Sequence, residues 1–506
     1  MRHIVLALAL AVACVESSAP IAAQDPARAL LQKSIDAMGG AAALEAVKVL
    51  KVDAMGHAYA LEQSERPEGP HLVTYQQLSE IRDHERGRIW RRQQQRNWSL
   101  ANWTGPDVVY AGDVVAINFN GQWGPHLPQQ LDQFRQDLAL SPERLLFTGR
   151  SAADLRVAAD RVLHGVSNHA VAFTYNGAKV TLYLNSHTSM PTMLQIVADD
   201  TFGIWGDVEL ERWYTFWTLQ PGGWQYPQQV TTTWNGSPHA DQTVFTIEVN
   251  AALDEARFAI PDDAAAAFRK RRDAAGAAMT GMRAARLDPS KAIRAAEDVV
   301  VFPGSWAVTL VRQPDGIVVL EAPIGSAYSA QVIGAAAATF PGVPIKAVVT
   351  TSDAWPHLGG VREYVARGIP IYALDLNKPI LERLIAATHS KTPDALARAS
   401  RAPEWHLVSE KTTIGSGETR VDVIPVRGEG SERMMMVHLP ALNLLYATDL
   451  LQYNRDRSGF FNPVYPAELA AAVAREGITG IDRTWAMHMD PIPWSKVTAA
   501  LAALGR

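Results

Sequence analysis

The chain has a single cysteine, Cys14, among 506 residues. One cysteine excludes an internal disulfide and any zinc site built on several thiolates, so a metal would have to be held by histidine, aspartate or glutamate. Beyond the N-terminus, no apolar run reaches about 18 residues, so we expect no transmembrane helix in the mature chain. The sequence also lacks the glycine-rich nucleotide loops, the Gly-x-Ser-x-Gly elbow and the His-Glu-x-x-His helix, which removes several common enzyme classes.

Neither positive nor negative charge is in large excess, because the net charge is only −5. A chain with so small an imbalance does not have the basic surface of a nucleic-acid binder, so we expect no nucleic-acid partner. Hydrophobic residues make up 47% and charged residues 20%, which is ordinary for a globular protein and excludes a wholly disordered chain. The length is several times that of a domain of about 150 residues, so at least two domains are expected.

The N-terminus resembles an export signal. A short basic start precedes the uncharged apolar run from Ile4 to Val15, and small residues lead to a suitable cleavage point after Ala23. We therefore expect residues 1–23 to be a signal peptide and the protein to be exported and periplasmic. Two alternatives stay open: a buried N-terminal helix, or a lipoprotein anchored to the membrane through Cys14, since residues 10–14 loosely resemble a lipobox.

Residues 24–268 are expected to form a β-rich domain. The spacing of apolar residues predicts a helix from Pro26 to Met38, ended by Gly39-Gly40. From Val49 to Val249 the pattern is mostly that of strands, with helical interruptions near residues 128–140 and 151–155. This pattern predicts a long antiparallel sheet, strongly curved or half-barrel in shape.

Nine of the fourteen tryptophans lie between Trp90 and Trp234. They either fill the core of a twisted sheet or line an apolar groove for a lipid or another apolar ligand. The helix start, the strand meander and the hairpin from Tyr183 to Pro191 resemble the periplasmic lipoprotein-carrier fold. That resemblance implies an apolar ligand as partner.

Residues 269–297 are expected to connect two domains. Their run from Arg269 to Arg272 is typical of a solvated helix face, and contact with membrane headgroups is the alternative. From residue 298 to 506, strands alternate with helices, which predicts a layered α/β domain.

The most specific motif of the chain lies at residues 351–360, which read Thr-Ser-Asp-Ala-Trp-Pro-His-Leu-Gly-Gly after an apolar strand. This loop resembles the His-x-His-x-Asp-His-x-Gly-Gly loop of the metallo-β-lactamase superfamily. Later segments resemble the strands that carry that family's bridging aspartate, at Asp449, and its final histidine, at His488. The resemblance implies an α+β protein whose C-terminal domain is an αββα sandwich, preceded by the curved antiparallel sheet domain.

The ligand positions of that family are only partly kept. Read in register, the resemblance places Ser352, Ala354, Pro356 and Gly430 at degenerate ligand positions, while His357, Asp449 and His488 survive. The three lost histidines would have held one zinc ion, and the three survivors belong to the second site. Two imidazoles and one carboxylate can hold one Zn²⁺ with an open position, or Fe²⁺ in a facial triad. The implied cofactor is zinc, one ion at most.

The expected function is that of an exported metal-dependent hydrolase acting on an ester, lactone or similar small molecule, with Asp449 both as metal ligand and as catalytic residue. Pro356 cannot replace the family's water-orienting aspartate, and Asp353, Glu429 or Asp490 are the carboxylates that could. The alternative is a non-catalytic pseudoenzyme or a periplasmic protein that binds an apolar ligand. A membrane partner is expected only if Cys14 is lipidated.

Overall fold

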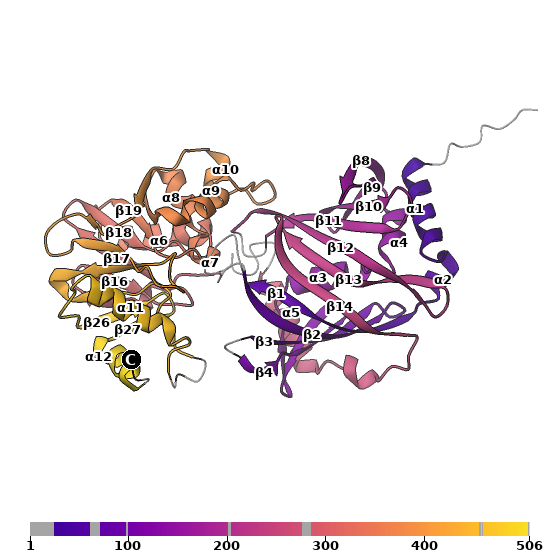
Figure 1. The fold of residues 1–506 in the computed structure, drawn as a ribbon, viewed down its shortest axis with the longest axis horizontal. Coiled ribbons are helices and arrows are strands. Elements are labelled where there is room, and N and C mark those ends of the chain that lie inside the picture. The colour runs from indigo at the N-terminus through magenta and orange to yellow at the C-terminus, as the bar shows by residue number, and fades with distance from the viewer. Residues whose placement is uncertain are drawn as a thin grey trace, which may run out of the picture.

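The computed structural model describes residues 25–60, 71–97, 100–200, 204–275, 285–454, 457, 459–503 and 505. They form two lobes, made of residues 25–275 and 285–505 (Figure 1). The fold is mixed α/β with extensive antiparallel sheets, which confirms the predicted class at that level. The expected signal peptide and Cys14 lie outside the described residues. In the described ranges, none of the helices combines the length and hydropathy needed to cross a bilayer.

The N-terminal lobe is built on one antiparallel sheet of fourteen described strands, in the order β7-β6-β5-β3-β2-β1-β14-β13-β12-β11-β10-β9-β8, with β4 paired to β3. The predicted strand region is therefore confirmed, and β10 has the predicted bounds. The strands are β1 (Val49–Ala60), β2 (Leu72–Asp83), β3 (Arg88–Asn97), β4 (Leu100–Thr104), β5 (Asp107–Ala111), β6 (Val114–Phe119), β7 (Gln122–Pro125), β8 (Arg156–Leu163), β9 (Val166–Tyr175), β10 (Ala178–Asn185), β11 (Pro191–Asp199), β12 (Asp207–Gln220), β13 (Trp224–Trp234) and β14 (Ser237–Val249).

Five helices accompany this sheet: α1 (Pro26–Ala37), α2 (Ala41–Glu45), α3 (Gln130–Ala139), α4 (Leu145–Ser151) and α5 (Asp262–Ala275). Helix α1 begins where the Asp25 side chain accepts a hydrogen bond from the Ala27 amide, and it ends before Gly39, as predicted. The helix predicted at residues 151–155 is wrong. Helix α4 lies just before them and ends at Ser151, because it buries Leu145 and Leu146 beneath α1 while Ala152 is already extended.

The large sheet curves around helix α3 (Figure 1). Strands β3 and β12 are separated in the sheet by four other strands, yet both reach the same carboxylate on α3. Arg91 of β3 donates to Asp137 Oδ2 at 3.0 Å, and Arg212 of β12 donates to Asp137 Oδ1 at 2.9 Å. Only a strongly curved sheet can bring these two strands to one helix.

Helix α5 crosses the boundary that the sequence suggested at residue 268. Phe268 is fully buried against β5 and β6, and Arg269 and Arg272 both pair with Asp113 of the same lobe. The first part of the predicted connector is therefore packed on the N-terminal lobe as a charged helix face, as the run of arginines suggested. The domain boundaries and the headgroup alternative stay predictions.

The C-terminal lobe contains two sheets. The first has the order β15-β16-β17-β18-β19-β20-β21 and the second β22-β23-β24-β25-β26-β27. Their strands are β15 (Ile293–Ala296), β16 (Val299–Phe302), β17 (Val308–Gln313), β18 (Gly316–Leu320), β19 (Ile345–Thr350), β20 (Ile371–Leu374), β21 (Trp405–Val408), β22 (Thr412–Ile414), β23 (Val421–Pro425), β24 (Met435–Leu439), β25 (Leu444–Tyr446), β26 (Arg483–Ala486) and β27 (Met489–Pro493).

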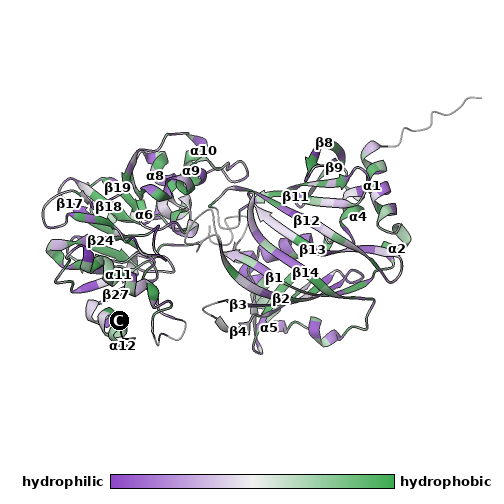
Figure 2. Cartoon of the chain, in the orientation of Figure 1, coloured by the Kyte–Doolittle hydropathy of each residue, from purple (hydrophilic) through white to green (hydrophobic). Residues whose placement is uncertain are grey.

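The two sheets face each other, and helices cover their outer sides. One buried cluster, which includes Val318, Val437 and Trp485, joins the sheets, and separate clusters join each sheet to its helices. Strands with both faces buried should be apolar throughout, and Figure 2 shows them largely hydrophobic, unlike the mixed strands of the N-terminal lobe. The helices are α6 (Ser326–Thr339), α7 (Trp355–Leu358), α8 (Val361–Arg367), α9 (Lys378–Ala386), α10 (Ala395–Arg398), α11 (Val464–Arg475) and α12 (Trp494–Ala503).

The helix predicted from Leu358 to Ala366 is divided in two at Gly359-Gly360, where α7 ends and α8 begins. Both glycines are points of close approach. A Cβ atom on Gly359 would lie 2.6 Å from the side chain of Ile204, which the N-terminal lobe inserts into the core of the C-terminal lobe. A Cβ atom on Gly360 would overlap Ser329 and approach the Ala322 carbonyl oxygen at 3.0 Å.

We expect Gly360→Ala to lower the free energy of unfolding by about 1–3 kcal/mol, because the new methyl group overpacks a filled site. Gly334→Ala in helix α6 is the matched control, since no atom lies within 4 Å of its Cβ position. That control should be neutral or gain up to about 1 kcal/mol through helix propensity. Urea unfolding of both variants measures the difference, and equal stabilities would contradict the assigned packing.

Candidate metal centre

Three chain segments bring the surviving motif residues together at one edge of the C-terminal lobe. His357 lies on helix α7 just after strand β19, Asp449 follows β25, and His488 lies between β26 and β27. The two sheets are tied at this edge, because the hydroxyl oxygens of Thr351 and Thr448 lie 2.7 Å apart in a hydrogen bond. Strand ends from both sheets therefore converge on one point.

The donor atoms of His357, Asp449 and His488 all lie within 4.8 Å of one another. His488 Nε2 is 3.2 Å from Asp449 Oδ1, and His357 Nε2 is 3.9 Å from Asp449 Oδ2. Donors around a tetrahedral zinc ion are roughly 3.3 Å apart, given bonds of about 2.0 Å. Among the described residues, this is the one group of three or more such side chains with metal-binding spacing.

The second nitrogen of His488 is held by the backbone. His488 Nδ1 lies 2.5 Å from the Ser305 carbonyl oxygen, so it must carry the proton and donate it there. Nε2 is then the ring nitrogen that faces Asp449, 3.2 Å from its Oδ1 atom, and it would bind a metal ion after loss of its proton. Metal-binding histidines are usually oriented in this way by a carbonyl or carboxylate acceptor, so the donor set fits a metal ion.

The cluster combines a neutral imidazole, a carboxylate, and a second imidazole whose protonated form the carboxylate favours. Burial lowers the pKa of His357 to about 4 even though Asp449 opposes the shift, so its ring is neutral at pH 7. Burial disfavours ionisation of Asp449, but the two histidines together hold its pKa below the ordinary value. For His488, burial lowers the pKa, but the contact with Asp449 raises it overall.

The four degenerate positions offer no second set of imidazole or carboxylate ligands. Ser352 uses its hydroxyl oxygen to accept a hydrogen bond from the Ala354 amide at 3.0 Å, and both residues are buried. The Pro356 carbonyl oxygen accepts from the Ile324 amide at 2.7 Å. The Gly430 amide donates to Glu468 Oε1 at 3.0 Å, and a Cβ there would lie 3.1 Å from Tyr465.

A buried acidic residue beside the centre was not predicted from the sequence. Glu321 follows strand β18, is fully buried, and accepts hydrogen bonds from Thr351 and from the Tyr446 hydroxyl, the latter at 3.1 Å. Burial raises its pKa to about 7, and the charge of Asp449 adds to the shift. In the sequence, Glu321 is marked only as an acidic residue that follows the apolar run Gly316–Leu320. This pattern is too common in proteins to indicate a functional residue.

A cavity of about 880 Å³ opens beside His488. Trp306, Tyr328 and Tyr453 contribute aromatic surface to it, and Asp490 contributes a carboxylate. Of the three carboxylates that the sequence offered in place of the missing aspartate, Asp490 lies in this cavity, while Asp353 is buried and Glu429 is exposed elsewhere. A small molecule could therefore reach His488 with a carboxylate in the same space.

No family model and no curated protein sequence matches the chain. Solved structures that resemble it include a metallo-β-lactamase from Pontibacter korlensis, with 15% identity over 44% of this chain and 100% of that one, at a TM-score of 0.34. The mono-zinc form of the metallo-β-lactamase FIM-1 from Pseudomonas aeruginosa has 12% identity over 42% and 95%, at a TM-score of 0.32. The alkylsulfatase Pisa1 from Pseudomonas sp. has 15% identity over 42% and 40%, at a TM-score of 0.32. Likenesses this weak do not bear on the chemistry of the centre.

Proposed function

We propose that this protein is an exported hydrolase of the metallo-β-lactamase type that works with one metal ion, held by His357, Asp449 and His488. The observation that carries the proposal is the convergence of these three donors, with the His488 ring fixed by the Ser305 carbonyl. The proposed cofactor is zinc, and the proposed substrate is a small ester or lactone. Export rests on the sequence of residues 1–23.

The roles of the chain's own groups follow from their positions. A zinc ion held here would supply Lewis acidity for attack on an acyl group. Asp449 keeps its negative charge in a half-buried place, and His357 stays neutral, so both are suited to act as ligands. Asp490, in the cavity beside His488, is the carboxylate that we assign to take up a proton from water.

A single-metal site is favoured by what occupies the neighbouring ligand positions. Ser352 is engaged with its own loop, and the Gly430 position is closed by Tyr465 and bound by Glu468. A second ion would need ligands from these positions, and the side chains there supply neither imidazole nor free carboxylate.

Hydrolysis assays on the full chain test the proposal. We expect the zinc-loaded protein to cleave p-nitrophenyl acetate or a simple lactone, a chelator to remove this activity, and added zinc to restore it. Activity that survives complete metal removal would overturn the proposal. Bound metal without turnover on a broad ester and lactone panel would support the alternative, a non-catalytic protein.

A further inference from the structure

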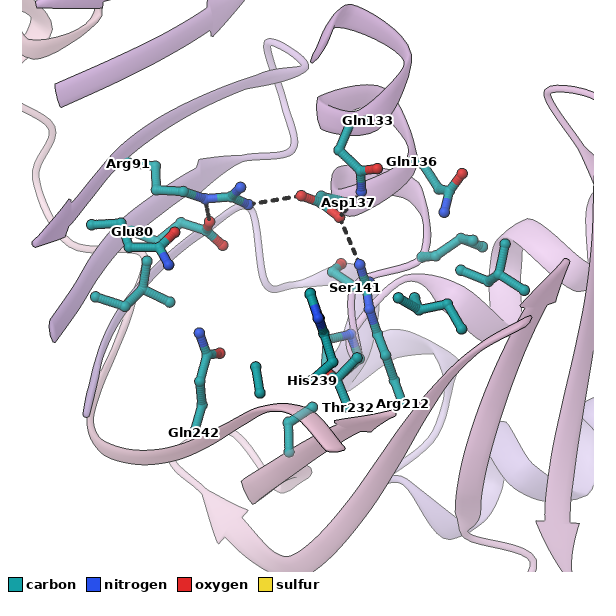
Figure 3. Close-up of a pocket in the computed structure, with 18 of the residues that line it drawn as sticks. Glu80, Arg91, Gln133, Gln136, Asp137, Ser141, Arg212, Thr232, His239 and Gln242 are labelled. Atoms are coloured by element: carbon teal, nitrogen blue, oxygen red, sulfur yellow. Dashed lines mark hydrogen bonds and ion pairs between the residues drawn. The ribbon is translucent and has the colours of Figure 1, made fainter. Parts of the chain in front are cut away.

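The curved sheet of the N-terminal lobe encloses a second cavity, separate from the metal centre. Its volume is about 530 Å³, within the roughly 300–1,000 Å³ typical of small-molecule sites. Strands β1–β3 and β11–β14 form its walls, and helix α3 lies across it. In Figure 3, Glu80, Arg91 and Asp137 line one side, and Thr232, His239 and Gln242 line the other.

One side of the cavity is a row of charges that neutralise one another. Glu80 accepts from Arg91, Arg91 also donates to Asp137 at 3.0 Å, and Asp137 accepts from Arg212 at 2.9 Å (Figure 3). Burial opposes ionisation of Asp137, but the two arginines hold its pKa at about 2, so the row stays ionised. With their charges paired, these groups do not select a charged ligand.

The remaining charged side chains of the lining are also hydrogen-bonded within the protein. Arg82 donates to Glu80 and Glu143, Asp199 accepts from Thr392, and Asp200 accepts from two backbone amides. Burial lowers the pKa of His239, so this ring is neutral at pH 7. The cavity is therefore polar, and each charged side chain among its described lining residues already has a hydrogen-bonding partner within the protein.

Glutamine amides, in contrast, are left open in this cavity. Within the part of the chain that the structure describes, no protein group hydrogen-bonds the side chains of five lining glutamines: Gln76, Gln93, Gln130, Gln136 and Gln242. The hydroxyl group of Tyr214, a buried lining residue, also has no partner. Each amide offers two donors and an acceptor, so the cavity presents many hydrogen-bonding groups that a ligand can use.

This lining disfavours an acyl chain, and with it the lipid or other apolar ligand that the sequence suggested for this domain. An apolar occupant would strip water from the amides and return no hydrogen bonds, which would weaken its binding about tenfold or more for each group left unpaired. A neutral ligand rich in hydroxyl or amide groups would satisfy them. The apolar parts of the lining, such as Leu210 and Val230, together with the ring of Trp234, would pack against its carbon skeleton.

We propose that the cavity under the curved sheet binds an uncharged saccharide, of the size of a few sugar rings, through its open glutamine amides. The site is independent of the metal centre, so the proposal stands or falls without the proposed hydrolase activity. Gln76 and Gln93 on neighbouring strands and Gln136 on the helix are placed to hydrogen-bond the sugar from two sides.

Calorimetric titration of the full chain with N,N′-diacetylchitobiose, maltose and laurate tests this. We expect at least one of the two sugars to bind with a dissociation constant below about 1 mM and laurate not to bind. Binding of laurate without either sugar overturns the proposal, and so does the absence of sugar binding up to about 10 mM.

Strand alternation provides a matched pair of variants. Gln76 and Gln93 line the cavity, while their neighbours Gln77 and Gln94 on the same strands point to the opposite face. Gln76→Leu/Gln93→Leu should weaken sugar binding about tenfold or more, and Gln77→Leu/Gln94→Leu should leave it unchanged. If the strand variants misfold, the sugar affinity of Gln136→Leu on α3 provides an independent test, and we expect it to be reduced as well. Equal affinities in all variants would place the sugar elsewhere and overturn the assignment.

Discussion

Asp449→Asn should lower the affinity for zinc by at least about 100-fold, because it removes the one anionic donor of the centre. In the same variant, hydrolysis of an ester substrate should fall to background. The neutral amide keeps the shape of the carboxylate, and its loss of charge also removes the ion-pair contact with His488 Nε2, which lies 3.2 Å away. Competition with a chromogenic zinc chelator measures the affinity.

Asp482→Asn is the control for that variant. Asp482 is an exposed acid of the same lobe and lies outside the donor cluster. It should bind zinc like the unaltered chain. Retention of full zinc affinity in Asp449→Asn would show that the ion is held by other groups, and equal losses in both variants would point to a general effect of charge.

We expect the ionisation of Glu321 to lower the free energy of unfolding by about 3 kcal/mol as the pH rises to its pKa in the folded protein, which is about 7. The unfolded carboxyl group titrates near 4.5, so the native state binds the proton more tightly between these two values. The stabilisation is complete below about pH 4.5 and is lost above about pH 7. The cause is burial of the carboxyl group between the two sheets, where its ionised form would be poorly solvated.

Comparison with Glu321→Gln isolates this contribution. The amide is a neutral group of the same shape, so the variant should lack the glutamate's pH dependence while other groups, such as His357, titrate in both proteins. Urea unfolding at about pH 5 and about pH 8 should show a larger fall for the unaltered chain, by about 3 kcal/mol. Parallel pH profiles would mean that Glu321 is ionised and solvated.

Acid unfolding belongs to a different pH window. Burial opposes ionisation of Glu143 and Asp394, but Arg82 and Arg362 hold the pKa values of these carboxyl groups well below the ordinary range. Their stabilising effect is present at neutral pH and is lost only as the pH falls below about 4. It therefore does not overlap with the loss attributed to Glu321 above about pH 4.5.

Much of the secondary structure could be predicted because burial imposes a period on the sequence. The alternation in Ala178–Asn185 and the mostly apolar run of Ile345–Thr350 each gave strands with the bounds that the structure has. The candidate metal ligands could be singled out in the sequence because each follows an expected strand end, and the structure brings their donor atoms within 4.8 Å of one another. The division of the helix at Gly359-Gly360 was not predicted, and neither was the close approach of Ile204 to Gly359, because Ile204 lies far away in the sequence.

The polar cavity could not be predicted from the sequence. Arg91, Asp137 and Arg212 meet only because the sheet curves, and 46 and 75 residues separate the paired positions along the chain. No local pattern marks such a group. The tryptophans pointed instead to an apolar interior, and Trp90 and Trp224 are buried, but Trp234 lines the polar cavity and packs on Trp355 of the other lobe.

The number of zinc ions bound by the full chain tests the central claim most directly. The metal-stripped protein, titrated with zinc in a calorimeter and checked by elemental analysis, should bind one equivalent, and the His357→Ala/His488→Ala variant should bind none tightly. Two tight equivalents in the unaltered chain, or one that persists in the double variant, would contradict a single metal ion held by His357, Asp449 and His488.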